Sequence, residues 1–388
     1  MLRPALRNPP GDQRKWHCVE LFAGAGGLAL GAEAAGFEHL ALVERDSDCA
    51  KTIRANRAEE KWPLLEQDVR EVDFSRWHGK ADIVCGGPPC QPFSIGGKAR
   101  GSTDQRDMFP EAVRAVREIQ PHAFVFENVR GLLRPVFANY VEYIRYQLTF
   151  PQVPKLPDET PEQHFHRLQK CFSQNNGPEP VYQVELTLAN AADYGVPQRR
   201  HRVFFVGFRR DINATWSFPD ATHSEEALDM AKANGTYWDR HKIPKSQRPT
   251  LTSKSCDLFD DKRLAWATTR DALRGLGKAS GTSLVNHVPQ PGARSYAGHT
   301  GSPLDVPAKT LKAGGHGVPG GENMVLLDDG SVRYFTVRES ARIQTFPDNY
   351  VFGASWTENM RQLGNAVPQK LAQVVLNSVK ESISQAVK

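Results

Sequence analysis

The stretch WHCVELFAGAGGLALGAEAAGFEHLALVE, residues 16–44, decides the fold. Near its two ends, HCVELF (17–22) and HLALVE (39–44) are short apolar runs of strand length. Between them the segment from Leu28 to Ala35 is rich in Ala and Leu and suits a helix, and the glycines before it allow a tight turn. A strand, a helix and a second strand in this order predict a right-handed βαβ unit with parallel strands.

The same alternation continues along the chain. ADIVC (81–85) and HAFVFEN (122–128) are candidates for buried strands, and residues 109–119 carry helical spacing between them. These patterns predict the α/β class, with a doubly wound, mostly parallel sheet. Farther on we expect a helix at 139–148, a proline-rich inserted loop at 150–161, and two antiparallel edge strands at 181–189 and 201–208.

The composition and hydrophobic pattern of the sequence change after residue 208. From Arg209 to about Val332, Gly, Ser, Thr, Asn and Lys are scattered without a βαβ rhythm, and a helical pattern returns at Gln362. We therefore predict an N-terminal arm at 1–15, a main domain at 16–208 completed by a C-terminal helix at 362–388, and a smaller irregular domain at 209–361.

Composition excludes several classes of protein. With 388 residues, 39% hydrophobic and 24% charged, the chain is neither disordered nor collagen-like, and its length suggests two domains. No run reaches the roughly 18 apolar residues of a membrane span, and the start lacks the apolar stretch of a signal peptide, so we expect a cytoplasmic protein. The six cysteines match no zinc spacing, and a net charge of +5 permits a polyanionic partner.

GGPPCQPFS (86–94) is the most informative motif. It follows a predicted strand, and its prolines stiffen the backbone around Cys90. A glycine-rich stretch at 95–106 follows, which we expect to act as a closable loop. A fixed thiol beside such a loop suits nucleophilic catalysis, whereas the alternative is a buried, inert cysteine.

Charged residues at two other strand ends complete a candidate catalytic set. Glu127 in FENV (126–129) lies near Cys90 if the two preceding strands are parallel neighbours, and it could assist an addition as an acid. In QRRHR (198–202), Arg200 and Arg202 would share one face of a strand and could stabilise a thiolate and bind a base. A helix-start acid and a solvated basic strand end are the alternatives.

A second set of residues suits an adenosine ligand. FAGAGGL (22–28) lacks the GxGxxG fingerprint, but Glu44 could accept both hydroxyls of a ribose and Asp68 an adenine amino group. Tight-turn glycines and ordinary helix-capping acids are the alternative interpretation. Asn365, expected in a turn before the C-terminal helix, is uninformative by itself.

Together these motifs resemble the carbon-5 cytosine DNA methyltransferase family of the bacterial restriction-modification type. They occur in the family's order from Leu21 to Pro368: FAGAGGL, Glu44, Asp68, GGPPCQPFS, ENV, QRRHR, RYFTVRESARIQTFP (333–347) and GNAVP (364–368). The resemblance implies an S-adenosylmethionine-dependent methyltransferase fold for the main domain and target recognition for the smaller one.

The resemblance also implies a reaction: transfer of a methyl group from S-adenosylmethionine to carbon 5 of a flipped-out cytosine in a specific duplex sequence. Cys90 would be the nucleophile, and Glu127, Arg200 and Arg202 would hold the cytosine. The residues implied for the S-adenosylmethionine pocket are Phe22, Gly24, Gly26, Glu44, Arg45, Asp68, Val69, Pro89 and Asn365. Arg45 departs from the aromatic residue that the family often has beneath the adenine, which puts stacking at this position in doubt.

We expect double-stranded DNA as partner, a monomer, no membrane and no metal, and a cognate restriction endonuclease that acts separately. The alternative function is a tRNA cytosine carbon-5 methyltransferase with the same catalytic parts. A catalytically dead DNA-binding relative is disfavoured by the intact Cys90 and Glu127, and a nucleotide-dependent oxidoreductase by the missing GxGxxG.

Overall fold

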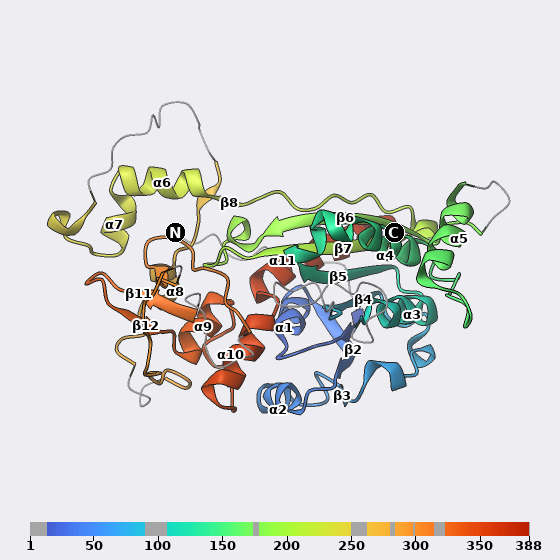
Figure 1. Ribbon diagram of the computed structural model, residues 1–388, viewed down its shortest axis with the longest axis horizontal. Coiled ribbons are helices and arrows are strands. Elements are labelled where there is room, and N and C mark those ends of the chain that lie inside the picture. The colour runs from blue at the N-terminus through green and yellow to red at the C-terminus, as the bar shows by residue number, and fades with distance from the viewer. Residues whose placement is uncertain are drawn as a thin grey trace.

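A seven-stranded sheet with the order β3-β2-β1-β4-β5-β7-β6 lies at the centre of the computed structural model (Figure 1). The structure describes residues 14–89, 107–173, 178–249, 262–279, 284–297, 299–313 and 323–387. The strands are β1 (Trp16–Leu21), β2 (Phe37–Glu44), β3 (Leu64–Glu66), β4 (Ile83–Gly86), β5 (Ala123–Val129), β6 (Tyr182–Asn190) and β7 (His201–Arg209). β1 to β5 are parallel, whereas β7 runs antiparallel to both β5 and β6. The predicted α/β class and the antiparallel pair at one edge are confirmed, and β3 is an addition.

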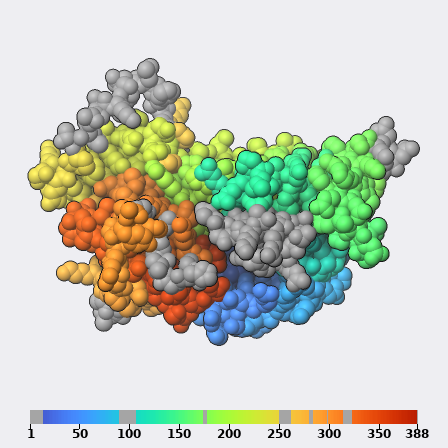
Figure 2. Space-filling view, in the orientation of Figure 1, coloured from blue at the N-terminus to red at the C-terminus, as the bar shows by residue number. Residues whose placement is uncertain are grey.

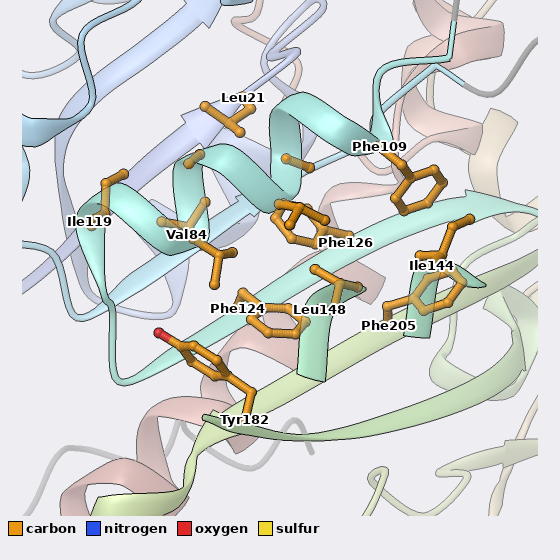
Figure 3. Close-up of a cluster of buried hydrophobic side chains, with 14 of the residues drawn as sticks. Leu21, Val84, Phe109, Ile119, Phe124, Phe126, Ile144, Leu148, Tyr182 and Phe205 are labelled. Atoms are coloured by element: carbon orange, nitrogen blue, oxygen red, sulfur yellow. The ribbon is translucent and has the colours of Figure 1, made fainter. Parts of the chain in front are cut away.

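Helices cover both faces of this sheet. They are α1 (Gly27–Ala34), α2 (Ser47–Asn56), α3 (Phe109–Ile119), α4 (Ala138–Thr149), α5 (Pro161–Ser173) and the long α11 (Gln369–Ala386). Alternate residues of β5 point to opposite faces: Phe124 and Phe126 pack under α3 and α4, whereas Val125 packs on the side of α11. Figure 3 shows the first of these cores, with Phe109 and Ile119 of α3 and Ile144 and Leu148 of α4 around Phe124, Phe126 and Phe205.

The region after β7 forms smaller, separate pieces. A two-stranded sheet joins β8 (His223–Ser224) to β9 (Leu264–Ala265), and a three-stranded sheet contains β10 (Ser302–Pro303), β11 (Met324–Leu326) and β12 (Val332–Tyr334). The helices here are α6 (Glu225–Ala233), α7 (Thr236–Arg240), α8 (Thr269–Leu273), α9 (Val337–Ile343) and α10 (Trp356–Asn365). The expected smaller irregular region is therefore present, although its boundaries stay a prediction.

Part of the predicted second domain packs against the main one. Ile343 and Phe346 share a buried cluster with Ala25 and Leu30 of the first βαβ unit. The extended chain after β7 also lies on the sheet, where Trp216 and Phe218 pack against the cluster under α11. The core of the main domain thus includes segments from both sides of residue 209.

Two details of the C-terminal and inserted segments differ from prediction. The C-terminal helix begins at Gln369 and not at Gln362, because the segment up to Asn365 ends α10 and Pro368 precedes the new helix. The insertion after α4 contains a 13-residue helix, α5, beyond its proline-rich loop. Within the described ranges, no helix is both long and apolar enough to cross a membrane.

Candidate active site

The turn after β1 has an unusual backbone. Phe22 has a positive φ of 57°, which is rare for a bulky residue and costs about 1–3 kcal/mol. Gly26, with φ of 82°, is held tightly, because a Cβ there would lie 2.8 Å from the Trp62 ring. At Gly24, with φ of 54°, a Cβ would meet no described atom within 4 Å. The turn is therefore packed at Gly26 and open at Gly24, where a ligand can approach the backbone.

Glu44 is tied directly to this turn. Its carboxylate accepts hydrogen bonds from the backbone N–H of Gly24 and of Asp46, each at 2.7 Å. Burial raises the pKa of Glu44 above its usual value. Each oxygen of an ionised carboxylate can accept two hydrogen bonds, so one site on each remains for a ligand.

Asp68 follows β3 at the same edge of the sheet. It caps a short 3-10 helix by accepting from the N–H of Arg70, and it forms ion pairs with the guanidiniums of Arg70 at 2.6 Å and Arg45 at 3.1 Å. Hydrogen bonding to Arg70, helped by Arg45, lowers the pKa of Asp68. The Arg45 side chain is 71% exposed, whereas Val69 is buried. An adenine at this position would meet a carboxylate flanked by two arginines.

Asn365 is the exposed last residue of α10, and not part of a turn as predicted. The residues around it pack closely on the first βαβ unit. A Cβ at Gly27 would lie only 2.5 Å from the carbonyl oxygen of Val367. This close approach brings the GNAVP segment next to the glycine turn, although they are more than 300 residues apart in sequence.

Cys90 lies outside the described residues, but the chain leading to it is fixed beside Glu127. β4 and β5 are parallel neighbours, as predicted. A Cβ at Gly87 would lie 3.3 Å from Glu127 Oε2, and the Asn128 side-chain amide donates to the carbonyl of Pro88 at 3.0 Å. The carbonyl of Pro89, the last described residue here, accepts from the Met108 N–H at 3.2 Å.

Glu127 and Arg202 form a buried ion pair. Arg202 Nε lies 2.5 Å from Glu127 Oε1, and both side chains are about nine-tenths buried. The pair spans two strands, since Arg202 stands opposite Val129 in the β5–β7 ladder. A buried carboxylate and a guanidinium at this position can each bind a polar edge of a planar ring.

Arg200 has a different environment. It precedes β7, so the two arginines do not alternate along a strand as predicted. Its fully buried guanidinium donates to the carbonyls of Gly364 at 2.7 Å, Ala366 at 2.9 Å and Leu311 at 3.3 Å. Burial lowers its pKa. Among the described residues, its Nε has no hydrogen-bond partner.

Two glutamines missed by the sequence analysis surround Arg200. The buried Gln198 side chain accepts from the N–H of Leu311 at 3.0 Å and donates to Gln344 Oε1 at 3.1 Å. Gln344 donates in turn to the carbonyl of Ala366. The sequence signal was present, because Gln198 begins the QRRHR motif, but amides carry no charge that marks them as functional.

One acidic cluster could suit a cation. Oxygens of Asp46, Asp48 and Glu358 lie within 4.8 Å of one another. The Arg361 guanidinium already contacts Asp46 at 2.7 Å and Glu358 at 2.6 Å, and it supplies the positive charge there.

The comparisons with known proteins agree with this geometry. A sequence model of the family C-5 cytosine-specific DNA methylase matches residues 16–150 and 153–381. The Type II methyltransferase M.NgoMIV of Neisseria gonorrhoeae is 31% identical over 95% of this chain and 98% of its own. M.FnuDI of Fusobacterium nucleatum, also a Type II methyltransferase, is 30% identical over 94% of each chain.

Solved structures show the same fold. The S. pombe Dnmt2 methyltransferase superposes with a TM-score of 0.57 at 15% identity, over 95% of this chain and 99% of that chain. A DNMT2 variant from Spodoptera frugiperda gives 0.56 at 16% identity, over 95% and 100%. With the family match across nearly the whole chain, this protein belongs to the C-5 cytosine-specific DNA methylase family and is a DNA cytosine-5 methyltransferase.

Proposed function

We propose that this enzyme methylates carbon 5 of a flipped-out cytosine in a defined duplex sequence, with S-adenosylmethionine as methyl donor and Cys90 as nucleophile. The observation that carries the proposal is the buried Glu127–Arg202 pair, which lies beside the segment leading to Cys90. Glu44 and the open Gly24 lie at the same edge of the sheet, so a donor and a base could meet there.

The residues present fit S-adenosylmethionine. The open space at Gly24 admits a ligand against the backbone, and the free acceptor sites of Glu44 suit the two hydroxyls of a ribose. Asp68 would accept from the adenine amino group, and Arg45, whose guanidinium is ion-paired with Asp68, would line the same side of the pocket. Phe22, Gly26, Val69, Pro89 and Asn365 would complete the pocket. The bound cofactor supplies an electrophilic methyl group on a sulfonium centre.

The chain's own residues would supply the activation of the cytosine. Carbon 5 is too electron-poor to attack a methyl group directly. Addition of the Cys90 thiolate to carbon 6, with a proton delivered to ring nitrogen 3 through Glu127, makes the ring an enamine whose carbon 5 is nucleophilic. Arg202 would bind the ring carbonyl, and the Nε–H of Arg200, which has no hydrogen-bond partner among the described residues, would be a second donor for the same region. After methylation, loss of the carbon 5 proton and expulsion of the Cys90 thiolate restore the aromatic ring.

Base selection would fall to the 209–361 region. The cytosine must leave the stack, at a cost of a few kcal/mol, before Cys90 can reach it. The segment from Arg209 to Val332 would read the flanking bases, because its Lys, Arg, Asn and Gly offer donors to base edges and phosphates. We place the enzyme in a restriction-modification system in the cytoplasm, as a monomer that needs no metal, with an endonuclease that acts separately.

Methylation of defined substrates tests the proposal. Purified enzyme with S-adenosylmethionine should convert cytosines in methyl-free genomic DNA to 5-methylcytosine within one recurring sequence, as read by bisulfite sequencing. A matched reaction on total tRNA should stay at background. Methylation of tRNA with no activity on duplex DNA would replace this proposal with the tRNA alternative.

A further inference from the structure

The segment that follows β5 is a rigid, basic projection beside the active site. Residues 130–137 form two successive 3-10 helices, Arg130–Leu133 and Pro135–Phe137. Leu132 and Phe137 anchor them in the core, whereas four consecutive residues from Leu133 to Val136 are exposed, and Val136 is 73% exposed. Pro135 fixes φ between the two anchors, so this projection has little freedom to collapse.

Among the described residues, the two arginines of this segment have no acidic partner. Arg130 and Arg134 are exposed, and neither forms an ion pair or a side-chain hydrogen bond with any described residue. Arginines on the following helices, such as Arg145 and Arg167, are paired with carboxylates. From Asn128 to Val141 the sequence contains no Asp or Glu, so the charge of the segment is uncompensated locally.

The position of the segment restricts what can contact it. Arg130 is three residues and Arg134 seven residues after Glu127, so their Cα atoms lie within about 11 and 25 Å of the Glu127 Cα. The first 3-10 helix packs on β7. The pKa of His201, the neighbour of Arg202, is lowered mainly by burial and next by the positive charge of Arg130. Duplex DNA carries a phosphate about every 3.4 Å along each strand, so several phosphates pass near a duplex site whose cytosine reaches Glu127.

The overall shape agrees with this position. In Figures 1 and 2 the part of the molecule with α6 and α7 and the part with α5 lie at opposite ends. Teal surface, the colour of the chain around β5 and α4, lies between these two ends.

We infer that Arg130 and Arg134 bind phosphates of the duplex next to the flipped cytosine, and that Leu133 and Val136 pack on the adjoining sugars. This inference rests on the proposed function, because it needs a duplex in the active site. The segment would hold the backbone in register for flipping without reading sequence, and sequence reading stays with the 209–361 region.

Salt-dependent binding tests the inference. Arg130→Ala and Arg134→Ala, each with S-adenosylhomocysteine, are titrated by fluorescence anisotropy on a cognate and a non-cognate duplex between 50 and 300 mM salt. Each loss should weaken both complexes by roughly 3- to 10-fold near 0.1 M salt and lower the slope of log Kd against log salt by about 0.9. The Arg→Lys variants should restore most of the slope, because they keep the charge.

Arg117→Ala is the matched control. Arg117 lies near the C-terminal end of α3, at the end of the sheet where β5 begins and away from the strand ends that form the site. Its side chain forms no ion pair or hydrogen bond with any described residue. Thermal melts should show all variants folded. Unchanged slopes, or a loss confined to the cognate duplex, would overturn the phosphate role alone if the wild-type enzyme methylates DNA. A wild-type enzyme that binds no duplex would overturn the proposed function as well.

Discussion

Removal of the Glu44 carboxylate should weaken cofactor binding strongly. In Glu44→Ala the proposed acceptor of the two ribose hydroxyls disappears, and the N–H groups of Gly24 and Asp46, which both donate to it at 2.7 Å, lose their partner. A hydrogen bond to a charged group contributes about 1.5–3 kcal/mol, so the Kd for S-adenosylhomocysteine should rise by about 10- to 160-fold. The effect on binding should exceed the effect on stability, since water can reach the open side at Gly24.

The pH dependence gives a second, independent measure of the same contact. Burial raises the pKa of Glu44, so its proton competes with the ribose hydroxyls at a higher pH than for a free glutamate. Affinity should therefore fall as pH decreases through that raised pKa, and the ionised form that binds the ribose should prevail above it. Because the pKa of Glu44 is raised in the folded protein, its protonated form favours folding. The stability that Glu44 contributes is therefore present at low pH and is lost as pH rises through the raised pKa. Glu44→Gln should bind weakly with no pH dependence in this range.

Isothermal titration calorimetry between pH 5 and 8 measures both effects. Glu38→Ala is the control, because Glu38 lies on the same strand at the opposite end and is exposed. Its Kd should match the wild type at every pH. An unchanged Kd for Glu44→Ala would refute the assignment of Glu44 to the ribose, whatever the behaviour of the remaining pocket residues.

Other substitutions should give equally distinct results. Cys90→Ser should abolish turnover while DNA binding stays within about threefold of the wild type. Only the wild type should form a covalent adduct with 5-fluorocytosine DNA. Turnover by Cys90→Ser near the wild-type rate would exclude covalent catalysis. Arg202→Ala leaves Glu127 buried without its partner and should cost about 3–5 kcal/mol of stability in denaturant titrations, with Arg202→Lys recovering part of it. Exchange of 209–332 for the matching segment of a relative with another target should transfer that relative's sequence preference; an active chimera that keeps the original target would contradict the assignment.

The first βαβ unit and the strand order near it could be read from sequence because their patterns are local. Buried parallel strands are continuous apolar runs, and each of β1, β2, β4 and β5 has one. β3 was missed because three residues are too short for a periodic signal. The helix from Pro161 to Ser173 was missed because the proline-rich stretch before it is typical of a loop.

For the candidate site, too, some features could be predicted from the sequence and others could not. Glu44 and Glu127 were predicted at strand ends, and the structure places both there. The environment of Arg200 could not be predicted, since its acceptors are backbone carbonyls more than 100 residues away in sequence. Every residue has a backbone carbonyl, so residue type does not show which carbonyls will accept from Arg200. The side-chain amides of Gln198 and Gln344 likewise carry no charge that would mark their role. Functional residues at strand ends can be predicted from the sequence, whereas the hydrogen-bond partners of a buried charge from distant segments are known only from the fold.

The packing of α11 on the first βαβ unit affects how the protein folds during its synthesis on the ribosome. A Cβ at Gly31 of α1 would lie 2.4 Å from Ala372 of α11, so the two helices fit against each other without space for even one added methyl group. At about 5–20 residues per second, roughly 10–30 seconds pass between synthesis of β7 and of α11. During that interval one apolar face of the sheet is uncovered and Arg200 lacks two of its carbonyl acceptors. A nascent chain at this stage exposes apolar surface that chaperones can bind, and we expect methylation to begin only after α11 has been made and has packed on the sheet.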